Sequence, residues 1–269
     1  MSEPNKTMDF EQIFNMACEL PYCKINREEY LTKQLTGLVS QEQLKTALED
    51  GTVNAGITIE ILNHVARSSI TNETSKATLI SAAAGLPGGV AMVATVPADL
   101  VQFYAHVLRI AQKLAYIYGA KEIAFNDSTE TTIMIYLGAM FGVTAAGAAL
   151  VKFAAANAAK IGAKVAKQPL AKHAIYNISK KILAWVSVKL TKDVTGKAVT
   201  KAIPIVSGVL SGGLSVATFL PMANRLKNQL SKLAAMSPAE LENANIEAGG
   251  ILADFVVLGE AEQDSLPML

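Results

Sequence analysis

PADLVQFYAHVLRIAQKLAYIYG, residues 97–119, is a run in which nearly all polar side chains fall on a single stripe. They recur at spacings of three, four, three and four residues, which places them along one face of an α-helix. The remaining positions are apolar around most of the circumference, as in a helix at the centre of a protein. Proline suits a first helical turn and glycine the residue after the last, so we expect a central helix over 97–118. The stripe consists of Asp99, Gln102, His106, Arg109 and Lys113.

The stripe allows three interpretations: a polar layer that pairs with another helix, a solvated face, or an acid/base site at His106 flanked by Arg109 and Asp99. Acid/base catalysis needs a partner within hydrogen-bond reach, and no hydrolase, zinc-protease or nucleotide-binding motif accompanies the stripe. The only cysteines, Cys18 and Cys23, are too few for a four-ligand zinc site. We therefore predict no catalytic residue, no cofactor and no metal, and keep an enzyme as the last alternative.

The flanking sequence is also helical in pattern, and no clear alternation of strand residues appears. Ser40 followed by Gln43 is a capping-box signature for a helix over 41–49, which Gly51 would end. The chain is therefore predicted to be an all-α, multi-helix bundle in a single domain, residues 1–269. Its expected parts are short N-terminal helices (1–67, with helices at 8–19, 27–38, 41–49 and 56–67), a glycine-rich core with a basic hairpin (77–235), and an acidic C-terminal helix and tail (236–269).

Three uncharged stretches, 77–98, 131–151 and 202–224, are 22, 21 and 23 residues long. Each is long enough to cross a bilayer core of about 30 Å. They are rich in small residues and two contain prolines, as buried helices of a bundle also are. Burial and membrane insertion both remain open, and glycines spaced four apart favour close helix packing in either case. These pairs are Gly85 and Gly89, Gly138 and Gly142, and Gly208 and Gly212.

Two segments of the core resemble each other. LPGGVAMVATVP at 86–97 and LSGGLSVATFLP at 210–221 align without a gap, each with a Gly-Gly pair and a final proline. This similarity suggests an internal pseudo-repeat of two helix pairs.

Residues 85–119 resemble the EcsC protein family, whose pattern is a glycine-rich apolar segment, an Asp-containing turn, a long helix with an arginine, and a terminal Tyr-Gly. Residues 203–225 resemble the second recognisable stretch of the family, so the resemblance spans about residues 40–235. It implies an all-helical bacterial protein that works at the membrane, linked to transport or secretion, with no defined enzymatic activity. The matching positions are Gly85, Gly89, Asp99, Arg109, Tyr118 and Gly119.

Charge is unevenly distributed, although the formal net charge is only +1. Residues 152–201 hold eleven lysines and one acid, whereas residues 236–269 hold seven acids and no base. The basic segment indicates an anionic membrane, a solvated hairpin or an acidic protein partner. It contains no arginine, which argues against base recognition in nucleic acid. The predicted membrane contacts are Lys152, Lys160, Lys164, Lys167, Lys172, Lys180, Lys181, Trp185 and Lys189.

The N-terminal residues contain no apolar signal run, which favours a cytoplasmic protein peripheral to the inner face of the cell membrane. The predicted function is a non-enzymatic membrane-associated protein that contacts anionic lipid or a membrane protein complex. The main alternative is a soluble helical adaptor or apolar-ligand-binding protein.

Overall fold

A computed structural model describes residues 10–84, 92–121, 123, 127–158 and 212–264. Within these residues the chain is all-α, which confirms the predicted fold class, and the only β-type pairing is an isolated bridge between Thr36 and Val39. The described helices are α1 (Phe10–Glu19), α2 (Arg27–Leu35), α3 (Gln41–Asp50), α4 (Ile59–Ala84), α5 (Met92–Ile117), α6 (Asp127–Phe141), α7 (Thr144–Ala158), α9 (Gly212–Ala235) and α10 (Pro238–Asp264).

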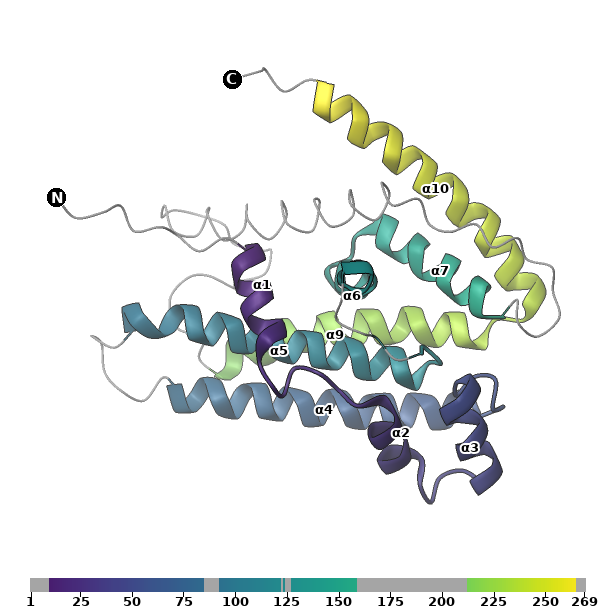
Figure 1. Cartoon of the computed structure of the whole chain (residues 1–269), viewed down its shortest axis with the longest axis horizontal. Coiled ribbons are helices and arrows are strands. Elements are labelled where there is room, and N and C mark those ends of the chain that lie inside the picture. The colour runs from purple at the N-terminus through teal and green to yellow at the C-terminus, as the bar shows by residue number, and fades with distance from the viewer. Residues whose placement is uncertain (1–9, 85–91, 122, 124–126, 159–211, 265–269) are drawn as a thin grey trace.

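Helix α5 is the centre of the molecule. It packs against α4 and α9, which lie along it, and against α1, α2 and α6 (Figure 1). Between Val101 and Tyr118 every side chain is buried except those of Gln102 and Arg109, which are partly exposed. The central helix predicted from the apolar circumference of residues 97–118 is therefore confirmed.

Helices α6, α7 and α10 lie on the other side of α5 and α9 from α4 (Figure 1). Helix α7 packs against both α6 and α10, and α6 and α7 also contact α9. Helices α2 and α3 lie at one end of α4. The acidic C-terminal helix is thus α10, which rests on α7 and not on the α4–α5 pair.

Several helix ends follow the local signals in the sequence. The Ser40 hydroxyl accepts a hydrogen bond from the Gln43 backbone N–H, and the Gln43 side chain accepts one from the Ser40 backbone, so the predicted capping box is present. Gly51 follows the last residue of α3. Gly119 adopts a left-handed φ of +96° directly after α5, which only glycine does readily.

Several predicted boundaries are wrong. The helix expected over 27–38 ends at Leu35. The helix expected over 56–67 begins at Ile59 and continues to Ala84, because residues 68–84 contain no glycine or proline that would end it. The central helix begins at Met92 and not at Pro97, so Pro97 and Asp99 lie within it and Asp99 is not in its first turn. A proline inside a helix removes one backbone hydrogen bond and crowds the carbonyl four residues earlier, which is why Pro97 was expected in the first turn.

The one uncharged stretch that is described in full does not form a single long helix. Stretch 131–151 is divided between α6 and α7 at Gly142, whose φ is +83°, so Gly138 and Gly142 do not form a helical pair. The Arg225 guanidinium of α9 donates to the Met140 carbonyl (2.6 Å) at the end of α6, where a cation is favourable. No helix among the described residues is long and apolar enough to span a membrane.

The other two stretches are only partly described. Stretch 77–98 supplies the end of α4 and the start of α5, and 202–224 is described from Gly212 onward, in α9. Gly85, Gly89 and Gly208 lie outside the described residues, as do residues 86–91, half of the first segment of the internal repeat.

Candidate functional site

One carboxylate of α4 contacts three side chains of the polar stripe of α5. The side chain of Glu73 is fully buried and accepts hydrogen bonds from three stripe residues. His106 Nδ1 and Arg109 Nε lie 2.7 and 2.8 Å from Glu73 Oε1, and Lys113 Nζ contacts Oε2. His106 and Lys113 are themselves buried. We call these four residues the Glu73 cluster.

The charges of the cluster control its protonation. Burial alone would raise the pKa of Glu73, but the hydrogen bond from His106, the bond and charge of Lys113 and the charge of Arg109 together outweigh it. The pKa of this carboxyl is therefore well below its ordinary value, and Glu73 is ionised at neutral pH. Burial lowers the pKa of Lys113, against the attraction of Glu73. The cluster thus resembles other buried ion groups, in which each charge depends on its partners.

The same face of α5 also holds the connection between α1 and α2. Arg109 donates to the Tyr22 carbonyl, and the Gln112 amide donates to the Cys23 carbonyl (2.9 Å) while accepting from the Ile25 N–H (3.1 Å). The Tyr22 ring covers the Arg109 guanidinium, 5.8 Å from its centroid. Polar side chains of α5 therefore fasten two segments, α4 and residues 22–25, to the central helix.

The contacts and burial of these side chains decide between a polar layer and a solvated face as interpretations of the stripe. The polar layer that pairs with another helix is correct, and the solvated face is wrong because His106 and Lys113 of the stripe are buried. The carboxylate that contacts His106 and Arg109 is Glu73, which the sequence analysis did not identify. The side chain of Asp99, the expected carboxylate, is not among those that the structure describes. One signal could have found it, since Glu73 is the only acidic residue between Glu60 and Asp99.

The thiol of Cys23 is buried under the same connection. Burial raises the pKa of Cys23 to about 11, so the side chain is a protonated thiol at neutral pH. Within the described residues, no group of three or more His, Cys, Asp or Glu side chains is placed to hold a metal ion.

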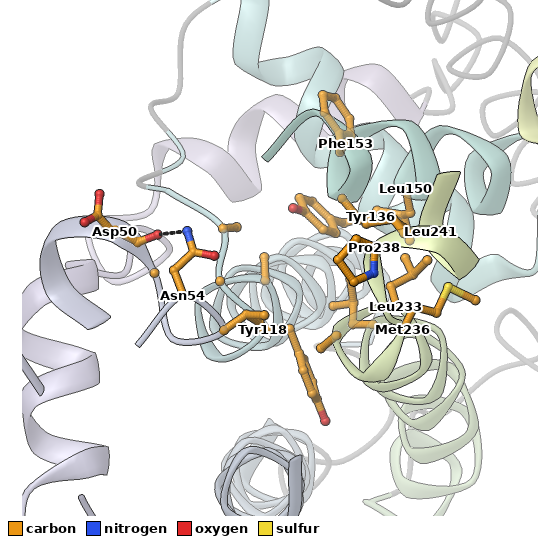
Figure 2. Close-up of a pocket in the computed structure, with 18 residues that line it drawn as sticks. Asp50, Asn54, Tyr118, Tyr136, Leu150, Phe153, Leu233, Met236, Pro238 and Leu241 are labelled. Carbon is orange, nitrogen blue, oxygen red and sulfur yellow. Dashed lines mark hydrogen bonds between the residues drawn. The ribbon is translucent and has the colours of Figure 1, made fainter. Parts of the chain in front are cut away.

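A second feature is an apolar cavity of about 210 Å³ at the C-terminal end of α5. It lies where the α3–α4 turn, the ends of α5 and α9, and helices α6, α7 and α10 meet. Figure 2 shows Asp50 and Asn54 on one side and a group of apolar side chains on the other. The apolar lining includes Leu150, Phe153, Leu233, Met236, Pro238 and Leu241.

The cavity offers few hydrogen-bonding groups. The Tyr118 hydroxyl points away from it (Figure 2) and donates to Asn63 Oδ1 of α4 at 2.7 Å. Asn54 Nδ2 donates to the Asp50 carbonyl at 2.8 Å. An apolar cavity of about 150 Å³ is enough to bind benzene, so this cavity has room for a small apolar group.

The residues that match the EcsC pattern do not come together in one site. Arg109 belongs to the Glu73 cluster, Tyr118 and Gly119 line the cavity, and Asp99 lies within α5. Gly85 and Gly89 are outside the described residues.

Of the predicted membrane contacts, only Lys152 is described. It is partly buried on α7, and its Nζ would lie 3.2 Å from a Cβ placed on Gly249 of α10. The remaining contacts lie outside the described residues; they are Lys160, Lys164, Lys167, Lys172, Lys180, Lys181, Trp185 and Lys189.

Comparison with known proteins adds no relative. No family model matches the chain, and neither the curated proteins nor the solved structures include a match to it.

Proposed function

We propose that the chain is a non-enzymatic, membrane-associated helical protein that contacts anionic lipid through residues 152–201 at the inner face of the cell membrane. The observation that carries this proposal is the ratio of eleven lysines to one acid in that segment. Each lysine close to an anionic leaflet contributes about 1 kcal/mol of attraction. The resemblance to the EcsC family supports the same location, together with a link to transport or secretion.

The Glu73 cluster supports the non-enzymatic part of the proposal. Three ionisable side chains of α5 direct hydrogen bonds to one buried carboxylate of α4. Arg109 makes a further bond to the Tyr22 backbone. These charged groups hold α4 and the connection between α1 and α2 against α5, so their role in the structure is to stabilise the packing.

The packing of α10 on α7 bears on how lipid would be bound. Helix α7 carries Lys152 and precedes the rest of the lysine-rich segment in the sequence. Helix α10 packs directly against α7. Exposed acids along α10 include Glu242, Glu247 and Asp254. Their negative charge would compete with lipid for lysines such as Lys152, so changing Glu242 and Glu247 to Gln and Asp254 to Asn should strengthen binding to anionic vesicles.

The test is binding to vesicles of stated composition. Trp185 is the only tryptophan, so its emission reports on the lysine-rich segment alone. With vesicles containing phosphatidylserine we expect a blue shift and co-sedimentation, both reversed by 1 M salt, which shortens the Debye length from about 10 Å at 0.1 M to 3 Å. Pure phosphatidylcholine vesicles should have little effect.

Charge reversal provides the matched control. Changing Lys160, Lys164 and Lys167 to Glu should abolish sedimentation at low salt. Changing Lys33, Lys45 and Lys121 to Glu alters the net charge equally at exposed positions elsewhere on the protein. This triple variant should lose much less of the binding to vesicles. Equal losses in the two triple variants, or no binding by the unmodified chain at low salt, would contradict a lipid contact at 152–201.

The cavity favours a second candidate function, the binding of a small apolar ligand, and we propose it alongside the first. Its volume of about 210 Å³ and its apolar lining are the supporting observations. Benzene, titrated while methyl signals of Leu150, Leu233 and Leu241 are followed by NMR, is a suitable probe. Ala154→Leu should block the shifts because Ala154 lines the cavity, whereas Ala156→Leu, at an exposed site on the same helix, should not.

A further inference from the structure

One wall of the apolar cavity is a close backbone contact between the α3–α4 turn and the end of α5. A Cβ placed on Gly51 would lie 2.8 Å from the Gly119 carbonyl oxygen, and a Cβ on Gly119 would lie 3.4 Å from Val53 Cγ2. Both glycines line the cavity, as do Val53 and Asn54. Asn54 lies on the side of the cavity opposite Leu241 (Figure 2). We call residues 51–54 the turn wall of the cavity.

The buried side chain of Arg27, at the start of α2, connects the two backbone segments that meet at this wall. Its Nη2 and Nη1 donate to the carbonyls of Ala47 (2.7 Å) and Leu48 (2.6 Å) in the last turn of α3. Its Nε donates to the carbonyl of Ala120 (3.0 Å), which follows α5 and lines the cavity. A guanidinium presents its N–H groups as a rigid planar fork, so this one side chain can hold two helix ends together. A cation is also favourable at the C-terminal end of a helix.

A second hydrogen bond joins the same two segments. Thr52 is fully buried in the turn wall, and its Oγ1 donates to the Ile117 carbonyl at 2.6 Å. Gly51 and Gly119 contribute no side chains to the contact between the turn and α5. The hydrogen bonds of Arg27 and Thr52 therefore fix how closely the turn wall approaches α5.

We propose that Arg27 is a positioning residue for the binding of a small apolar ligand in this cavity. Arg27 is not among the lining residues, and it acts by keeping the turn wall and the end of α5 in contact. A site that is formed for only part of the time binds its ligand more weakly by that fraction. Arg27 thus sets the affinity of the cavity without touching the ligand. This inference rests on the ligand-binding function proposed above for the cavity.

The test is Arg27→Lys, with benzene as the probe and methyl NMR of the full-length chain as the measurement. Lysine keeps the positive charge but lacks the fork that reaches both helix ends. We expect the Kd for benzene to rise about tenfold, as for the loss of one hydrogen bond. At saturation, the benzene-induced shift of the Val53 methyls should become smaller, while that of the Leu241 methyls on the opposite side is retained. An effect of Arg27 on global stability alone would change neither the Kd of the folded chain nor the ratio of these two shifts.

Arg225→Lys is the matched control. Arg225 also donates to a carbonyl at a helix end, that of Met140, and neither of these residues lines the cavity. This variant should bind benzene with unchanged affinity and unchanged shifts. If Arg27→Lys does not fold, Thr52→Val removes the other hydrogen bond of the wall with little change in shape. It should then produce the same weaker binding and the same smaller shift at Val53.

The failure of this inference can be distinguished from the failure of the ligand site. If the unmodified chain binds benzene and the folded Arg27→Lys variant binds it equally well with the same Val53 shift, the positioning role is overturned and the ligand site stands. Equal losses in Arg27→Lys and Arg225→Lys would overturn the positioning role as well. If no lining methyl of the unmodified chain shifts with benzene, the ligand site itself is refuted, and the role of Arg27 with it.

Discussion

The Glu73 cluster and the apolar cavity lie against the same helix, α5, and use it in opposite ways. At the cluster, four polar side chains fill the space between α4 and α5, and three hydrogen bonds converge on one carboxylate. At the C-terminal end of α5, apolar side chains from several helices meet and leave about 210 Å³. The comparison shows that buried titratable groups can hold helices together, while the larger empty volume lies elsewhere along the same helix.

The strongest test of this contrast is removal of the carboxylate charge. Glu73→Gln keeps the shape of the side chain but leaves the buried Lys113 and the partly buried Arg109 without an anion. Breaking a buried ion group in this way costs about 3–5 kcal/mol. We expect a loss of that size in the free energy of unfolding, measured with urea.

Glu60→Gln is the matched control, because Glu60 is exposed on the same helix. Its cost should stay below about 1 kcal/mol, as for exposed charges in general. If the two variants were equally stable, the cluster would not stabilise the fold as proposed.

Acidification should remove part of the same stabilisation. Because the folded-state pKa of Glu73 is lower than its unfolded-state pKa, the unfolded chain takes up a proton first as the pH falls. The contribution of Glu73 is complete above about pH 5 and declines below the ordinary glutamate value of about 4.3. The difference in unfolding free energy between the unmodified chain and Glu73→Gln should therefore shrink from pH 6 to pH 3. A difference independent of pH would show that charge is not its cause.

Local signals in the sequence were enough for much of the fold. Ser40 and Gln43 predicted a helix start, Gly51 and Gly119 predicted helix ends, and the apolar circumference of residues 97–118 predicted the central helix. These features depend on residues close together in the chain, where spacing determines contact.

Local sequence signals could not predict Glu73 as the partner of the polar stripe, nor could they predict the apolar cavity. Glu73 is 33 residues from His106, and their contact requires α4 to continue past residue 67, where the predicted helix ended. The cavity combines side chains from residues as far apart as Asp50 and Leu241. Such contacts depend on how helices pack, and no local spacing encodes them.

The smallest effect should come from filling the cavity. Ala149 and Ala154 both lie on α7, but Ala149 is fully buried and does not line the cavity, whereas Ala154 does. Overpacking a filled core costs about 1–3 kcal/mol, so Ala149→Leu should lower the free energy of unfolding by that amount. Ala154→Leu places its added methyl groups in space that is already empty, and we expect a change within about 0.5 kcal/mol of zero, since no neighbour must move. Urea unfolding of both variants, measured in the same buffer, checks the difference. Equal destabilisation by the two leucines would mean that the space beside Ala154 is closed in solution, and benzene should then fail to bind there as well.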